Sequence, residues 1–190
     1  NMTLSLINDY FSYHDEISKK LDSESINFAT KLIINKFKQG NAVYTCGNGG
    51  SAHTASHYIT DWVKMGTSIA GLSLKGFSLC DNVGMITAYG NDFNYDEIFA
   101  GQLRSSLRKD DLVIAISGSG NSKNVLNAIN YANQNEADTL AIVGFDGGKL
   151  KKIAKYNFHV PCFDMQICED IHLKFGHIVM KAICNIGIER

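Results

Sequence analysis

Two short segments rich in glycine and small polar residues could together bind an anion. The first is 46–51, Cys-Gly-Asn-Gly-Gly-Ser, and the second is 117–122, Ser-Gly-Ser-Gly-Asn-Ser. Each follows an apolar run and precedes a predicted helix, so that backbone N–H groups and a helix N-terminus can surround an anion. The second segment adds the hydroxyls of Ser117, Ser119 and Ser122, and its glycines let the backbone approach closely. Neither segment contains lysine, which favours a small phosphorylated ligand that must also be released.

Acidic and histidine side chains on two predicted helices form a second candidate site. His57 and Asp61 are four residues apart and therefore share one face of a helix. The predicted C-terminal helix carries, within about two turns, Glu169, Asp170, His172 and His177. Two histidines and several carboxylates that converge on a pocket suit either proton transfer or the binding of a divalent metal. The alternative is that they are solvated side chains on helix surfaces.

The elements that must position these residues alternate between strand and helix along the chain. Strands are predicted at 42–46, 69–73, 112–116, 139–143 and 158–160, and helices at 51–64, from a cap at 81 or 82, at 95–107, 124–133, 146–154 and 166–188. This order predicts an α/β fold in which a central parallel sheet is flanked by helices in a doubly wound three-layer sandwich. Ligands of such sheets bind at the carboxyl ends of the strands, where both glycine-serine segments fall.

Two further amphipathic helices are predicted before the first strand. The second would be capped by Ser23 or Ser25 and would stop at Gly40. Such a pair either covers a face of the sheet or packs against a neighbouring subunit. The length of 190 residues fits one domain, which we expect to span 1–190.

Composition narrows the functional classes. The net charge of −1 gives no basic field for nucleic acid or for a membrane surface, and we expect neither as a partner. No apolar run approaches the roughly 20 residues that a bilayer span needs, and the first residues lack a secretion signal pattern. The five cysteines are scattered and odd in number, which favours reduced thiols and a cytoplasmic protein.

The first glycine segment also matches a dinucleotide-binding fingerprint, Gly47-x-Gly49-x-x-Ala52. A dinucleotide site needs an acidic residue about 20 residues later to hold the ribose, and the segment 72–75, Leu-Ser-Leu-Lys, offers none. The fingerprint also leaves the second segment unexplained. We therefore expect no nucleotide cofactor.

Three motifs, in this order and spacing, resemble those of the phosphoheptose isomerases, which have the sugar isomerase (SIS) fold. They are 47–51 (Gly-Asn-Gly-Gly-Ser), 90–93 (Gly-Asn-Asp-Phe) and 117–122, and a Glu-Asp-Ile-His…His pattern at 169–177 extends the match over nearly the whole chain. The resemblance implies an aldose–ketose isomerase that interconverts D-sedoheptulose 7-phosphate and D-glycero-D-manno-heptose 7-phosphate through an enediol. The product would supply heptose for lipopolysaccharide or capsule.

The resemblance also assigns roles to residues. It implies that the serine segment holds the sugar phosphate and that the substrate contacts are Asn48, Gly49, Ser51, Asp92, Ser117, Gly118, Ser119, Ser122 and Glu169. It implies Asp61 and His177 as the acid–base pair, and one zinc ion per site held by His57, Asp61, Glu169 and His177. It further implies a homotetramer whose active sites draw on more than one subunit, which would employ the leading helices.

Two of these positions depart from the family pattern. Asp61 replaces a glutamate, which retracts the carboxylate by roughly 1 Å or more. Glu169 replaces a glutamine and adds an anionic oxygen that favours a divalent metal. We therefore expect an isomerase with a metal-supported site. The alternatives are an isomerase of another sugar phosphate and a non-catalytic SIS-fold protein that binds phosphosugars or regulates a partner.

Overall fold

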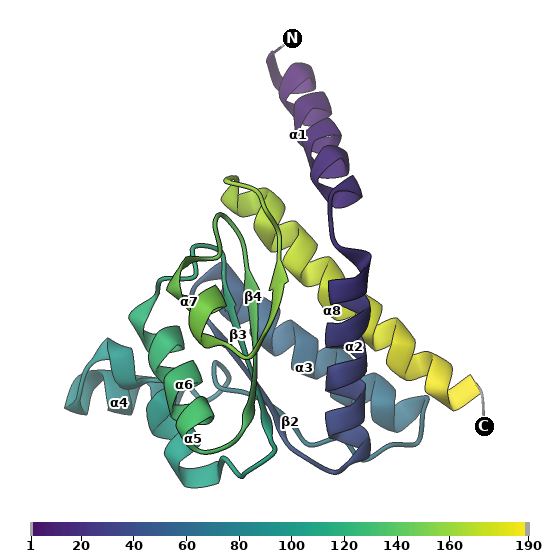
Figure 1. Cartoon of the computed structure of the whole chain (residues 1–190). Coiled ribbons are helices and arrows are strands. Elements are labelled where there is room, and N and C mark those ends of the chain that lie inside the picture. Colours follow the sequence, from purple (N-terminus) through teal and green to yellow (C-terminus); the bar gives the residue numbers. More distant parts are fainter. Residues whose placement is uncertain (1, 189–190) are drawn as a thin grey trace.

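The computed structural model describes residues 2–188, which fold around a five-stranded parallel sheet (Figure 1). The strand order is β2-β1-β3-β4-β5, and every neighbouring pair is parallel. The strands are β1 (Val43–Gly47), β2 (Gly76–Ser78), β3 (Leu112–Ser117), β4 (Asp138–Val143) and β5 (Tyr156–His159). The predicted α/β three-layer architecture is confirmed.

One face of the sheet is covered by three helices, α2 (Ser23–Lys38), α3 (Gly50–Ser68) and α8 (Met165–Ile188). Alternate strand residues such as Ile114 point into this layer, as the period of two in a strand requires. Trp62 on α3 is fully buried here, and its indole N–H donates to the carbonyl oxygen of Gly176 on α8 at 2.9 Å. The single tryptophan is therefore a core residue.

The opposite face is covered by α5 (Ala100–Ser106), α6 (Lys123–Gln134) and α7 (Gly148–Ile153). A second core, which includes Val113 and Ala115 of β3, fills the space between these helices and the sheet. The helix α4 (Val83–Asp92) and the 3-10 turn η1 (Tyr95–Glu97) lie beside this layer, and α4 stands out from the body of the molecule (Figure 1).

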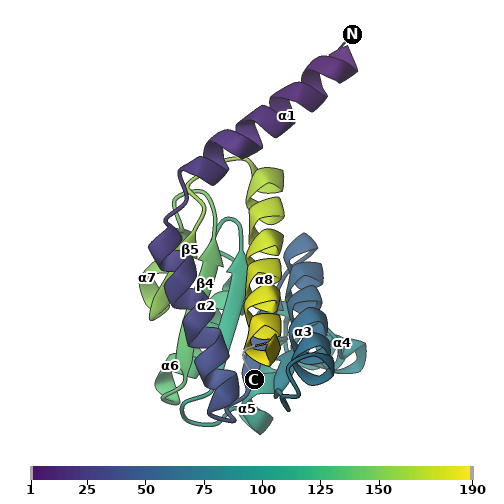
Figure 2. The ribbon, with the colours of Figure 1, turned by 90° about the vertical axis from the view of Figure 1, so that its right-hand side faces the viewer.

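The first helix, α1 (Met2–Lys19), projects away from the rest of the chain (Figure 2). It buries only His14 and Ile17. Two side-chain contacts connect α1 to α8: the Tyr10 hydroxyl donates to Asp170 at 2.5 Å, and the ammonium of Lys174 lies 2.8 Å from the His14 ring. Among the described helices, none is long and apolar enough to cross a bilayer.

Three sequence expectations are corrected. The strand expected at 69–73 is absent: α3 runs on to Ser68, and the apolar residues beyond it fold back on the helix, with the amide of Leu72 bonded to the carbonyl of Gly66. The sheet edge is formed instead by β2, three residues later.

The other two corrections concern helices. The cap of α2 is Asp22, whose carboxylate accepts a hydrogen bond from the amide of Glu24. The helix expected at 95–107 is divided into η1 and α5.

The strand order explains where a ligand can bind. The chain leaves β1 toward one edge of the sheet and continues from β3 toward the other, so the connections after these adjacent strands diverge. A crevice opens at such a switch point, at the carboxyl ends of the strands. Gly47 pairs with Ile116 at this end of the sheet, which places the two glycine-serine segments side by side.

Candidate active site

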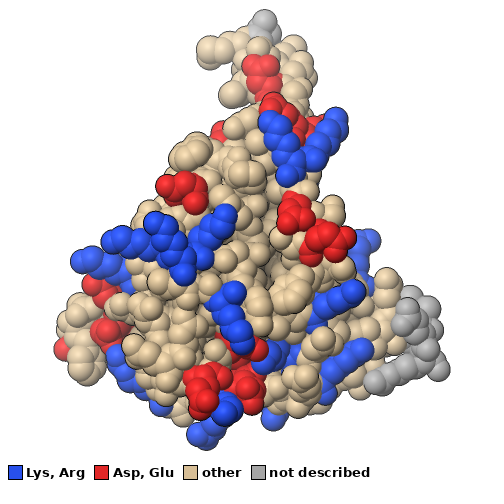
Figure 3. Space-filling view, viewed as in Figure 1, with Lys and Arg blue, Asp and Glu red and all other residues tan. Residues whose placement is uncertain are grey.

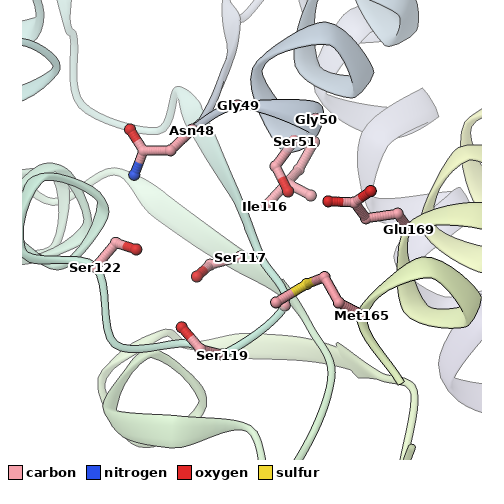
Figure 4. A pocket seen from close by; sticks show the side chains of 11 residues that line it. Asn48, Gly49, Gly50, Ser51, Ile116, Ser117, Ser119, Ser122, Met165 and Glu169 are labelled. Atoms are coloured by element: carbon pink, nitrogen blue, oxygen red, sulfur yellow. The ribbon is translucent and has the colours of Figure 1, made fainter. Parts of the chain in front are cut away.

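A pocket of about 300 Å³ lies at the switch point (Figure 4). It is walled by the loop after β1, the loop after β3 and the first turn of α8. Its lining residues are Asn48, Gly49, Gly50, Ser51, Ile116, Ser117, Gly118, Ser119, Ser122, Met165 and Glu169. Eight of the nine residues predicted to contact substrate are thus brought together, since Asp92 alone is missing from this set.

The loop at 117–122 is held in a fixed shape by its own hydroxyls. The Ser117 hydroxyl oxygen accepts from the amide of Gly120 at 3.1 Å. The backbone amide of Gly144, just after β4, donates to the carbonyl of Gly118, and the amide of Leu150 in α7 donates to the carbonyl of Gly120. Because the loop is already ordered without a ligand, binding loses less conformational entropy, which favours affinity.

Asn48 is fixed by a network that sequence inspection missed. Its side-chain amide exchanges two hydrogen bonds, each 2.8 Å, with the amide of Asn124, which is buried at the start of α6. The Tyr95 hydroxyl donates to the Asn48 oxygen at 2.9 Å. Asn48 and Asn124 are 76 positions apart in the sequence, so their pairing cannot be predicted from local residue spacing.

Glu169 faces the pocket from α8, across from the loop at 117–122 (Figure 4). Its carboxylate lies against the start of α3, where a Cβ added to Gly50 would come within 2.8 Å of the carboxylate oxygen Oε1. Met165, at the start of α8, crosses the floor of the pocket and contacts Gly118. Sequence inspection did not single out Met165, which has no motif of its own.

Three of the four predicted metal ligands form a separate cluster. The Asp61 carboxylate lies 3.0 Å from Nε2 of His57 and 3.6 Å from Nε2 of His177. The ligand atoms of the three residues all fall within 4.8 Å of one another. Two imidazoles and a carboxylate are a donor set that suits zinc. Glu169, the fourth predicted ligand, lies outside this cluster.

The packing of α3 against α8 explains the separation. The Tyr58 hydroxyl donates to the carbonyl of His172, and Trp62 bonds one turn further along both helices to Gly176. The two helices therefore run in the same direction, and Glu169 precedes His177 by about 12 Å along the axis of α8. The pocket and the cluster lie one after the other along the same pair of helices.

Asp92 lies apart from both groups in the single chain. It is an exposed residue at the end of α4, and its carboxylate accepts from the side chain of Asn91 at 3.0 Å. Its predicted contact with substrate stays a prediction.

His172 is a buried histidine to which the sequence analysis assigned no role in the site. Its Nε2 donates to the carbonyl of Val143, the last residue of β4, at 2.9 Å, and its Nδ1 has no partner. Burial disfavours the charged ring and lowers the pKa of His172 to about 4. The neutral ring therefore fastens α8 to the sheet close to the pocket.

Basic side chains lie outside the pocket. The described lining residues include no lysine or arginine. Outside, exposed lysines occupy α7 and the start of α6, namely Lys123, Lys149, Lys151 and Lys152. The face seen in Figure 3 carries both signs of charge, with lysines gathered over α7.

Comparison with known proteins identifies the family. The SIS domain family matches residues 9–144. A phosphoheptose isomerase of Aliarcobacter butzleri is 34% identical over 187 residues, which make up 97% of this chain and 98% of that protein. The chain belongs to the phosphoheptose isomerase family. Another member, from Helicobacter pylori, is 34% identical over 92% of each chain.

Solved structures of phosphoheptose isomerases have the same fold. The enzyme from Neisseria gonorrhoeae superposes with a TM-score of 0.87 at 26% identity, over 95% of this chain and 98% of its own. The one from Francisella tularensis gives 0.86, also at 26% identity. The resemblance drawn from the motifs is confirmed, and the chain belongs to a family of sugar-phosphate isomerases.

Proposed function

We propose that this protein interconverts D-sedoheptulose 7-phosphate and D-glycero-D-manno-heptose 7-phosphate through an enediol. The observation that carries the proposal is the composition of the pocket at the switch point. Hydroxyls and backbone amides of the loop at 117–122 offer neutral donors to a phosphate, and a carboxylate stands across the cavity. Isomerisation needs groups that move a proton between two adjacent carbons, and the family resemblance assigns this to Asp61 and His177.

A divalent metal fits the cluster on α3 and α8. His57, Asp61 and His177 would hold it, and the two nitrogens and one oxygen favour zinc. When bound, such an ion polarises the oxygen atoms of a sugar. The assignment of Glu169 as a further ligand stays a prediction, because its carboxylate lies outside the cluster.

Assembly into a homotetramer is supported by the apolar surface of α1. Leu4, Leu6 and Phe11 expose 59%, 65% and 66% of their surface on a helix that projects from the body. Exposed apolar surface of this kind marks a contact with a partner. We further propose that the protein acts in the cytoplasm and supplies heptose for surface polysaccharide.

The test is turnover of sedoheptulose 7-phosphate followed by NMR, with the protein as purified, after chelation, and with zinc restored. Turnover that chelation abolishes and zinc rescues is the expected result. If chelation does not change the turnover rate, the proposed metal requirement is wrong, and the proposed isomerase activity stands. If the folded protein does not turn over sedoheptulose 7-phosphate but does turn over another ketose phosphate, its substrate differs from that of the family. The replacements at Asp61 and Glu169 would be consistent with that result.

A further inference from the structure

The side-chain amide of Asn124 is held in one orientation. Asn124 is 2% exposed at the start of α6, and its oxygen Oδ1 accepts from the backbone amide of Val125 at 2.9 Å. A backbone N–H only donates, so the side-chain atom that it contacts must be the oxygen. The backbone of the helix therefore distinguishes the two ends of this amide, which are alike in shape.

The orientation of Asn124 determines that of Asn48. The Asn124 nitrogen donates to the Asn48 oxygen, and the Asn48 nitrogen donates to the Asn124 oxygen, each at 2.8 Å. Reversal of the Asn48 amide would place nitrogen against nitrogen and oxygen against oxygen. The Tyr95 hydroxyl donates to the same Asn48 oxygen at 2.9 Å, so both lone pairs of this oxygen are used.

Tyr95 is itself held in place by α6. It begins η1, and the side-chain nitrogen of Asn127 on α6 donates to the carbonyl of Asp96 in this turn at 3.1 Å. Asn124 and Asn127 are three residues apart and therefore lie on one side of the helix. This side of α6 positions both groups that donate to the Asn48 oxygen.

One N–H of Asn48 is left for a ligand. The nitrogen has two hydrogens, of which the bond to Asn124 uses one, and the described residues supply no acceptor for the other. In Figure 4 this nitrogen lies on the side of Ser117 and Ser122, and the oxygen is turned away from them. Asn48 thus adds an N–H donor to the hydroxyls that line the same cavity. A phosphate dianion can accept from this N–H, whereas it has no hydrogen to donate to a carbonyl oxygen in its place.

We propose that Asn124 is a positioning residue for the proposed reaction and that Tyr95 assists it. Asn124 holds the Asn48 amide with its nitrogen, not its oxygen, toward the phosphorylated ligand. Asn124 and Tyr95 do not line the pocket, so each acts through Asn48. The inference rests on the proposed function, because it takes a sugar phosphate as the ligand of this pocket.

The test is a double-mutant cycle on the binding and turnover of sedoheptulose 7-phosphate. Calorimetry with the sugar phosphate at isomer equilibrium gives Kd, and NMR gives kcat and KM. The variants are Asn124→Leu, which has nearly the same shape without hydrogen-bonding groups, Tyr95→Phe, Asn48→Ala, and each of the first two combined with Asn48→Ala. Asn133→Leu is the matched control, because Asn133 lies at the far end of α6 and also forms two side-chain hydrogen bonds. Melting temperature is measured on every variant.

We expect Asn124→Leu to raise Kd and KM about tenfold, the effect of one hydrogen bond, and to change kcat less. Tyr95→Phe should raise both by about two- to threefold, because Asn124 still donates to the Asn48 oxygen. In the Asn48→Ala background neither replacement should raise Kd or KM further, since the group through which it acts is gone. Asn133→Leu should leave Kd and KM at the wild-type values, whatever its melting temperature.

The inference is wrong if Asn124→Leu and Tyr95→Phe keep the wild-type Kd and KM. It is also wrong if their effects persist in full in the Asn48→Ala background, as they would if the two residues only stabilised the fold. If Asn124→Leu does not fold, the cycle between Tyr95 and Asn48 decides, because Tyr95→Phe removes only a hydroxyl from a ring that is 58% exposed.

Failure of the proposed function gives a different result. A wild-type protein that binds the sugar phosphate without turnover would remove the isomerase activity, and the cycle in Kd would still decide the role of Asn124. A wild-type protein that binds none of a panel of ketose and aldose phosphates would overturn both proposals.

Discussion

Gly120 shows how a single residue sets the form of the loop at 117–122. Its φ of +67° is one that L side chains rarely adopt, and a Cβ there would press on the carbonyl oxygen of Gly147. Because that neighbour is backbone, it cannot rotate away. The loop can therefore close on β4 and α7 only with glycine at this position.

Replacement of Gly120 by alanine tests this constraint. We expect a loss of about 1–3 kcal/mol in unfolding free energy and a raised KM for the sugar phosphate, because strain and clash displace the loop. Gly40→Ala is the matched control, since Gly40 has a φ of +78° with open space around its Cβ. Chemical denaturation and steady-state kinetics measure both effects. Equal losses in the two variants would show that strain alone, without the clash, accounts for the result.

At the scale of elements, the position of α8 decides the geometry of the site. This helix carries Met165 and Glu169 into the pocket and His177 into the cluster with His57 and Asp61. Between them, His172 fastens the helix to the end of β4. Its ring is packed against Phe158, and the nearby His159 also disfavours a charge on it.

The protonation of His172 predicts a pH dependence of stability. Because burial lowers its pKa to about 4 from 6.5, the unfolded chain binds the proton more readily as pH falls through this window. Stability is therefore complete above about pH 6.5 and decreases toward pH 4, by about 3 kcal/mol from this group. His172→Gln keeps an N–H donor for Val143 and does not titrate.

We expect the difference in unfolding free energy between wild type and His172→Gln to change by this amount between pH 7 and pH 4. Urea denaturation across the range measures it. Parallel pH curves for the two proteins would contradict the prediction.

Sequence alone located the buried strands and the two loops that line the pocket, because their signals are local. The run 112–116 is apolar throughout, and the glycine- and serine-rich segment 117–122 follows it directly. The edge strand β2 was missed because Gly76-Phe77-Ser78 has no apolar run, whereas the apolar residues from 69 to 74 cover the end of α3. The distance of Glu169 from His57, Asp61 and His177 depends on the register of α8 against α3, which spacing within one helix does not contain.

At the scale of the whole molecule, the first half of α1 exposes apolar side chains that no other described part of the chain covers. Its apolar side chains Leu4, Ile7 and Phe11 recur every three to four residues, and Ser5, Asp9 and Ser12 form a separate polar stripe. Leaving such a stripe in water is unfavourable by about 25 cal/mol per Å² of apolar surface. A second copy of the chain would cover it in the proposed tetramer.

Phe11→Asp should dissociate this assembly, because it places a charge in the apolar contact. Ser12→Asp adds the same charge on the polar stripe and should leave the assembly intact. Light scattering coupled to size-exclusion chromatography gives the mass of each. A wild-type protein that is monomeric at micromolar concentration would contradict the proposed tetramer.

The distribution of charge around the pocket has a kinetic consequence. Lys149 and its neighbours lie next to the loop at 117–122, which has no charged side chain. The Lys149 amide donates to the side-chain oxygen of Asn121 at 3.0 Å. Exposed cations attract a phosphate dianion over distances that salt screens, whereas hydroxyls and amides hold it only at contact. Raising the ionic strength therefore slows the encounter with the sugar phosphate and leaves its residence time unchanged.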